Sequence, residues 1–187
     1  MRGQITAVLC AAVMGATAVG LVVPPSHAVS RQKAGYSGTE RPVYSTIKDI
    51  MESIVDPSAD VVWNAAGTIV DKDGAHELLP KTPEEWLDVR RAAVRMIEAG
   101  NLLMMPGREA APSGVKSEAP GVELEPPQIT ALIKKKRKSF DDFARMLQAL
   151  GVEVLKASDA KDTSLLLDIG EKMENVCEGC HKTFWYP

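Results

Sequence analysis

Residues 166–181 of this 187-residue chain read LLDIGEKMENVCEGCH. Apolar side chains recur in this stretch at steps of three and four residues: Leu166, Ile169, Met173, Val176 and Cys180. This spacing places them on one face of an α-helix, as in a helix that packs on a hydrophobic core. The stretch therefore predicts an amphipathic helix close to the C-terminus, and the remaining segments decide what that helix packs against.

The first segment with the same periodicity covers residues 47–65. Its core-facing positions are Ile47, Met51, Ile54, Ser58, Val61 and Ala65. Pro57 lacks a backbone N–H and crowds the preceding turn, so it should bend the helix, with Asp56 as a cap. Because the spacing keeps its phase across Pro57, one bent helix is predicted.

Two longer segments follow. The second begins at residues 82–85, TPEE, where a threonine cap, a proline in the first turn and a glutamate three residues on form a helix start. It continues to Leu103. The third carries apolar positions from residue 129 to residue 154, and predicts an uninterrupted helix with Lys136 on its apolar face.

The connections between these segments differ in character. Residues 66–81 contain two short apolar runs around Asp73-Gly74, a dipeptide that favours a small β-hairpin. Residues 106–127 hold five prolines and three glycines, so they predict a long connection. Four amphipathic helices without a long strand pattern predict an all-α fold, an antiparallel four-helix bundle.

The N-terminus has the features of an export signal. Arg2 precedes an uncharged run rich in Ala, Val and Gly, and small residues end it at Ala28. We expect residues 1–28 to be a cleaved signal peptide, 29–42 a flexible leader and 43–187 the helical domain, in the periplasm. An uncleaved membrane anchor is the alternative. The formal net charge of −3 disfavours nucleic-acid binding, which requires neutralisation of phosphates.

The predicted last helix carries two thiols and an imidazole in the spacing C-x-x-C-H. Cys177, Cys180 and His181 share one side of a helix, because positions three and four apart are neighbours there. Two thiols so placed can each bond one vinyl group of a haem, and the histidine can bind its iron. A structural zinc site would need a fourth ligand, and a redox dithiol usually begins a helix. The motif thus favours one covalently attached haem c, with zinc as a remote alternative.

The predicted bundle, with C-x-x-C-H near the end of its last helix, resembles the cytochrome c-prime family (class II c-type cytochromes), which includes low-spin six-coordinate relatives. The resemblance covers residues 47–187 and implies thioether bonds to Cys177 and Cys180, with His181 as the proximal ligand. It further implies that Met51 is the sixth ligand in a low-spin protein, and that a homodimer is common. The chain departs from the family at Trp185, where a basic residue is usual.

Several side chains have more than one interpretation. Met51 is either an iron ligand or a core residue on the apolar face. Phe184 either covers the haem edge, as a cofactor-binding residue, or caps the end of the bundle. His76 is expected on the exposed hairpin. Residues 134–138, KKKRK, form either a solvated helix surface or a docking area for an acidic redox partner.

These features favour an electron-transfer protein over an enzyme, because no general-base constellation accompanies the motif. The expected partners are soluble or membrane-bound redox proteins. The main alternative is a five-coordinate haem protein that binds nitric oxide or carbon monoxide in an apolar distal pocket.

Overall fold

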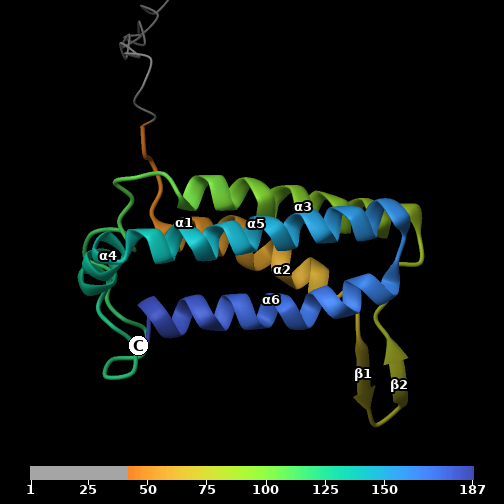
Figure 1. The fold of residues 1–187 in the computed structure, drawn as a ribbon. Helices are drawn as coiled ribbons and strands as arrows, with labels where there is room; N and C mark the ends of the chain where they lie inside the picture. The colour runs from red at the N-terminus through yellow and green to blue at the C-terminus, as the bar shows by residue number, and fades with distance from the viewer. Residues whose placement is uncertain (1–41) are drawn as a thin grey trace, which may run out of the picture. The chain divides into compact units, whose positions relative to one another are not determined.

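Residues 42–187, which are those that the computed structural model describes, are mostly helical and contain one antiparallel sheet of two strands (Figure 1). The all-α class with a small hairpin is thereby confirmed. The predicted signal peptide and all but the last residue of the predicted leader lie outside the described residues.

The first predicted helix consists of three consecutive segments: α1 (Ile47–Ile50), a π-helical turn η1 (Met51–Val55) and α2 (Asp56–Trp63). In the π turn the backbone N–H of Asp56 donates to the carbonyl of Met51, five residues earlier. The turn ends at Val55, two residues before Pro57, whose ring would clash with the carbonyl four residues before it in a regular helix. Asp56 makes no capping hydrogen bond, so its predicted role as a cap is wrong.

The buried face of this segment is broader than predicted. Ser58 and Ala65, two predicted core positions beyond Pro57, are buried, so the predicted phase holds there. Ile54 and Val61 are only partly buried, whereas their neighbours Val55 and Val62 are buried. The additional residue in the π turn accounts for this partial shift.

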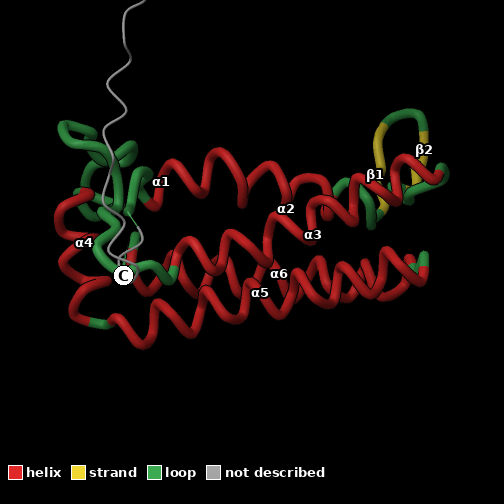
Figure 2. Tube along the Cα trace, turned by 90° about the horizontal axis from the view of Figure 1, so that it is seen from above, coloured by secondary structure: helices red, strands yellow, loops and turns green. Residues whose placement is uncertain are grey.

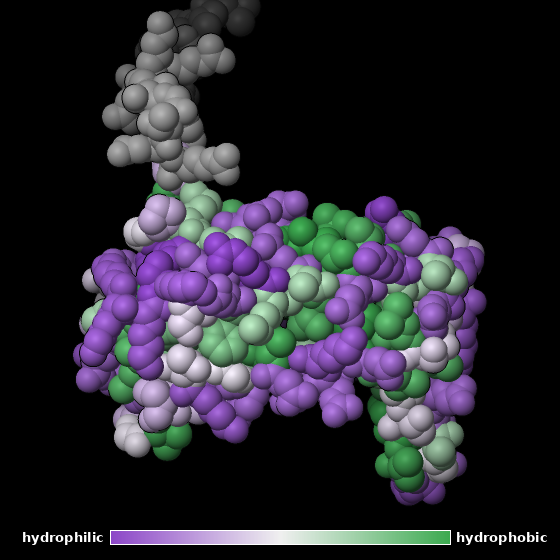
Figure 3. All heavy atoms as spheres, in the orientation of Figure 1, coloured by the Kyte–Doolittle hydropathy of each residue, from purple (hydrophilic) through white to green (hydrophobic). Residues whose placement is uncertain are grey.

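The hairpin is formed by β1 (Thr68–Asp71) and β2 (Gly74–Glu77), which pair in the register Thr68↔Glu77. Its turn residues are 72 and 73, one position before the predicted pair, and Gly74 follows with φ of +125°. His76 lies on the exposed hairpin as expected, with Nε2 3.2 Å from Oδ1 of Asp71. Figure 3 shows hydrophobic side chains on the hairpin, consistent with the exposure of Ile69 and Val70.

Helix α3 (Pro83–Leu103) begins with the predicted capping box, in which Thr82 and Glu85 bond each other's backbone N–H. It packs most extensively against α5 (Arg137–Ala160). Two glycines make the contact close. A Cβ on Gly100 would lie 2.9 Å from the carbonyl oxygen of Ala144, and one on Gly151 would lie 2.8 Å from Cγ1 of Ile97.

The third predicted helix is divided, because α4 (Pro126–Lys135) and α5 are separated at Lys136, which has φ of −110° and ψ of 38°. Lys136 is exposed, so its predicted place on the apolar face is wrong. The physical reason is that residues 134–138 offer no apolar side chain to hold this turn on the core. Ile129 and Ile133 are the buried apolar residues of α4, and Phe140 is the first buried residue of α5.

The connection between α3 and α4 is bound to the start of α1. The backbone N–H groups of Ile47 and Lys48 donate to the carbonyls of Glu109 and Ala110, both at 2.9 Å. Arg108 is buried and donates to the carbonyl and hydroxyl of Ser45. These bonds make the connection a packed part of the fold. The connection is also shorter than predicted, because residues 126 and 127, its last two predicted residues, form the start of α4.

Helix α6 (Thr163–Phe184) packs against α5 and also contacts α2, where the indole N–H of Trp63 donates to the carbonyl of Gly170 at 3.3 Å. Figures 1 and 2 show α4 and the C-terminus at one end of the long helices, with the hairpin at the other. None of the described helices is long and apolar enough to cross a membrane.

Candidate functional site

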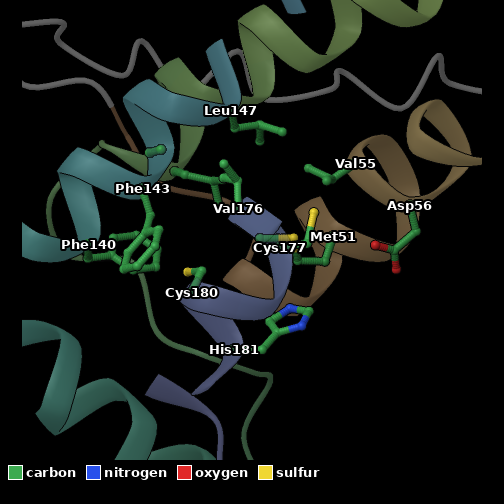
Figure 4. A pocket seen from close by; sticks show the side chains of 12 residues that line it. Met51, Val55, Asp56, Phe140, Phe143, Leu147, Val176, Cys177, Cys180 and His181 are labelled. Carbon is green, nitrogen blue, oxygen red and sulfur yellow. The ribbon is translucent and has the colours of Figure 1, made fainter. Parts of the chain in front are cut away.

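A cavity lies between η1, the first half of α5 and the last turns of α6, and encloses about 500 Å³ including the part open to solvent. Figure 4 shows the side chains that line it. They are mostly apolar, with a few groups capable of chemistry among them: Met51, Val55, Asp56, Leu103, Phe140, Phe143, Ala144, Leu147, Val176, Cys177, Cys180 and His181.

The two thiols of the motif lie on the same wall of the cavity, one turn apart on α6. Both are free and half-buried. Burial raises the pKa of Cys177 to about 11, with smaller contributions from Glu174 and Asp56, and burial raises the pKa of Cys180 to about 12. Burial therefore favours the neutral thiol over the thiolate at both positions.

His181 follows on the same helix and lines the same cavity (Figure 4). Its carbonyl accepts the backbone N–H groups of Trp185, at 2.7 Å, and Tyr186, at 3.1 Å, which closes the end of α6. Its ring lies 6.1 Å from the rings of both residues, centre to centre. The imidazole is thus held between the cavity and the aromatic C-terminus.

The C-terminus is itself anchored. The hydroxyl of Tyr186 donates to Glu178 at 2.7 Å, and the carbonyl of Trp185 accepts the backbone N–H of Leu124 at 2.8 Å. Trp185 occupies the position where the resembled family commonly has a basic residue. Here its backbone joins the motif helix to the long connection.

Met51 reaches the cavity from the opposite segment of the chain. It is the first residue of η1, is partly buried, and in Figure 4 its sulfur lies beside Cys177 above the His181 ring. The structure therefore brings together four of the five residues singled out from the sequence: Met51, Cys177, Cys180 and His181.

Phe184, the fifth, is not among the residues that line the cavity. It is fully buried and makes edge-to-face contacts with Phe140, at 5.5 Å, and Phe143, at 6.4 Å. Those two rings do line the cavity. Phe184 thus supports the aromatic wall from behind.

Sequence inspection did not identify Asp56 as a site residue. Its carboxylate lines the cavity rim on the side away from Phe140 and Phe143 (Figure 4). Asp56 is exposed, but the protein atoms around its carboxylate remove part of its water and raise its pKa, and attraction to His181 opposes that effect. The available signal was the Asp-Pro pair in a helical pattern, but only the π turn shows that the carboxylate faces the cavity.

The basic segment is largely neutralised by its neighbours. Lys134, Arg137 and Lys138 form ion pairs with Glu109, Asp141 and Asp142 at 2.6–2.9 Å. Within residues 42–187, Lys135 and Lys136 have no such partner. The local positive surface is consequently smaller than five consecutive charges imply.

The motif allows two cofactors, zinc and haem, which require different surroundings. In the described part of the chain, no three His, Cys, Asp or Glu side chains converge as a metal ion would require, so the motif alone does not form a zinc cage. A haem makes different demands: two thiols on one edge, an imidazole beside them and apolar walls. The cavity supplies all three, so its residues fit a haem.

Comparison of the chain with family models, with curated proteins and with solved structures gives no match.

Proposed function

We propose that this protein is a c-type cytochrome that carries one covalently attached haem and transfers single electrons in the periplasm. The observation that carries the proposal is the shared cavity: both thiols, the imidazole of His181 and the thioether of Met51 line it, although Met51 is more than a hundred residues away in sequence. The apolar remainder of the lining is the environment that a porphyrin ring requires.

In this proposal Cys177 and Cys180 would hold the haem by thioether bonds, each S–H adding in full across one vinyl group, so that no oxidant would be needed and nothing would be released. His181 and Met51 would supply the nitrogen and sulfur ligands of the iron. When bound, the haem supplies a reversible one-electron couple. The protein residues hold its position, limit the access of water and set the charge around it.

The arrangement of the helices supports the antiparallel four-helix bundle of the resembled cytochrome c-prime family. The four members would be residues 47–63, α3, α5 and α6, with α4 as an additional short helix. The first member contacts α3, α3 contacts α5, α5 contacts α6, and α6 contacts α2. This cyclic order of neighbours encloses the buried core.

A redox partner would approach the end of the molecule where the cavity, α4 and the C-terminus lie. Lys135 and Lys136 are exposed there without ion-pair partners among the described residues, and are available to an acidic partner surface. Such charges mainly accelerate and orient the encounter, so partner binding should weaken with rising salt.

Covalent attachment is tested by acid–acetone extraction of the full chain, produced together with a c-type haem maturation system. The haem should remain with the wild-type protein. Cys177→Ala and Cys180→Ala should release it or yield apoprotein, while Met173→Leu, a change of a buried residue on the same helix that does not line the cavity, should not. Release of haem from the wild-type protein would contradict the proposal.

Ligation by Met51 is tested by Met51→Leu, which removes the sulfur with little change in volume. The wild-type protein should be low-spin, with the weak long-wavelength absorbance of an iron–thioether bond. The variant should lose that band, become high-spin and bind carbon monoxide when reduced, and Met173→Leu should behave as wild type. A wild-type protein that is already high-spin and binds carbon monoxide would instead favour the gas-binding function.

A further inference from the structure

The π turn η1 is the one irregular turn of the helical segment that borders the cavity, and it determines which side chains of that segment reach it. In a regular α-helix, residues five apart point in different directions, because each residue advances by about 100°. In η1 the backbone bond joins Met51 to Asp56. The wider turn brings residue i+5 close to the face of residue i, so Met51 and Asp56 both line the cavity.

Asp56 thereby supplies the only carboxylate among the residues that line this cavity. Its charge interacts with His181 and with Cys177, which come from the opposite wall. Among the described residues no cation forms an ion pair with Asp56 within 4 Å. Lys48 is the cation of this helical segment that attracts the Asp56 carboxylate. It forms ion pairs with Glu52, at 2.6 Å, and with Glu118, at 2.5 Å.

We propose that Asp56 tunes the redox centre, its carboxylate acting as a fixed negative charge beside the iron that lowers the midpoint potential. The inference rests on the proposed haem. The oxidised iron carries one more positive charge than the reduced iron, so a nearby anion stabilises the oxidised state more. Asp56 is exposed, as Asp60 is, so the effect rests on its position: Asp56 lines the cavity and Asp60 does not.

Asp60 offers a matched control. It lies one helical turn beyond Asp56 on α2 and lines a separate hollow beside the hairpin. Asp56→Asn and Asp60→Asn therefore remove the same charge from the same helix at different distances from the cavity. Asp56→Glu keeps the charge and changes only its reach.

The experiment is a spectroelectrochemical titration of the haem-loaded full chain at pH 8, where the carboxylates are ionised. Asp56→Asn should raise the midpoint potential clearly more than Asp60→Asn, Asp56→Glu should remain close to wild type, and added salt should reduce the difference. An upward shift no larger than that of Asp60→Asn, or a downward shift, would overturn the proposal.

Two further measurements separate this result from other failures. Retention of haem through acid–acetone extraction shows that the proposed cytochrome function holds, whatever the potentials are. Far-ultraviolet circular dichroism and an unchanged Soret band show that each variant is folded and ligated. A properly loaded Asp56→Asn protein with the potential of Asp60→Asn therefore counts against the role of Asp56 alone.

Discussion

Helix α5 contributes to two regions that differ in the size of their side chains: its close contact with α3 and the cavity beside α6. Along α3, α5 is so close that Gly100 and Gly151 have no room for a side chain, and Ala93 is fully buried nearby. On its other side, α5 directs Phe140, Phe143 and Leu147 toward a cavity. Close packing of small residues maintains the framework, and large side chains form the walls of a space in which a cofactor can bind.

The largest expected change in the free energy of unfolding concerns the aromatic residues between the packed core and the cavity. Phe184→Ala removes a ring that is fully buried against Phe140 and Phe143, so it should lower the free energy of unfolding by about 3–5 kcal/mol. Phe143→Ala removes a half-buried ring that already borders the cavity, and should cost less. Urea denaturation of the apoprotein measures both changes. Equal losses would show that the cavity wall is packed as firmly as the core.

A pair of identical substitutions gives the next largest effect. A Cβ at Gly151 would lie 2.8 Å from Cγ1 of Ile97 and 3.0 Å from the carbonyl oxygen of Ala93, whereas one at Gly170 would meet Trp63 at an ordinary 3.7 Å. Both changes to alanine gain the same helix propensity, about 1 kcal/mol. Gly170→Ala should therefore stabilise the protein, and Gly151→Ala should be less stable than Gly170→Ala by about 1–3 kcal/mol.

Thermal or urea unfolding of these two variants is the measurement. If Gly151→Ala were as stable as Gly170→Ala, α3 and α5 could separate at little cost. The proposed difference between a rigid α3–α5 contact and the open cavity beside α6 would then be wrong.

The smallest effect concerns the cap that precedes the cavity wall. Hydrogen bonds from Thr46, above all from its backbone N–H at 2.7 Å, lower the pKa of Asp49 below its ordinary value. The stabilisation is fully present above the ordinary carboxylate pKa and is lost as the pH falls through the lowered, folded-state value. Asp49→Asn should therefore reduce the loss of stability as the pH falls from about 5 through the lowered pKa of Asp49.

The control for this change is Glu84→Gln, which removes an exposed first-turn carboxylate that makes no capping bond among the described residues. Denaturant midpoints across the acidic range provide the comparison. The role assigned to the Asp49 cap fails if both variants show the same pH dependence as the wild-type protein.

The second and last predicted helices agree best with the structure, although the clearest periodicity was that of residues 129–154, which divide into α4 and α5. The start of α3 at Thr82 and the buried faces of α3 and α6 agree with the sequence, because capping and three-four spacing act through neighbours along the chain. Two of the errors, the burial expected of Ile54 and Val61 and the continuity across Lys136, have a common cause. Periodicity counts residues, and it cannot detect a turn that contains an additional residue or a helix that changes direction.

The sequence by itself determined the helical class, the hairpin and the motif Cys177, Cys180 and His181, because each depends on residues close together in the chain. Only the tertiary structure decided that Met51 shares a cavity with the motif, that Phe184 stands behind the cavity wall and that Asp56 faces the cavity. These placements depend on how α6 packs against distant helices and on a single π turn. Packing of that kind reflects the shapes of many side chains together, which no local pattern contains.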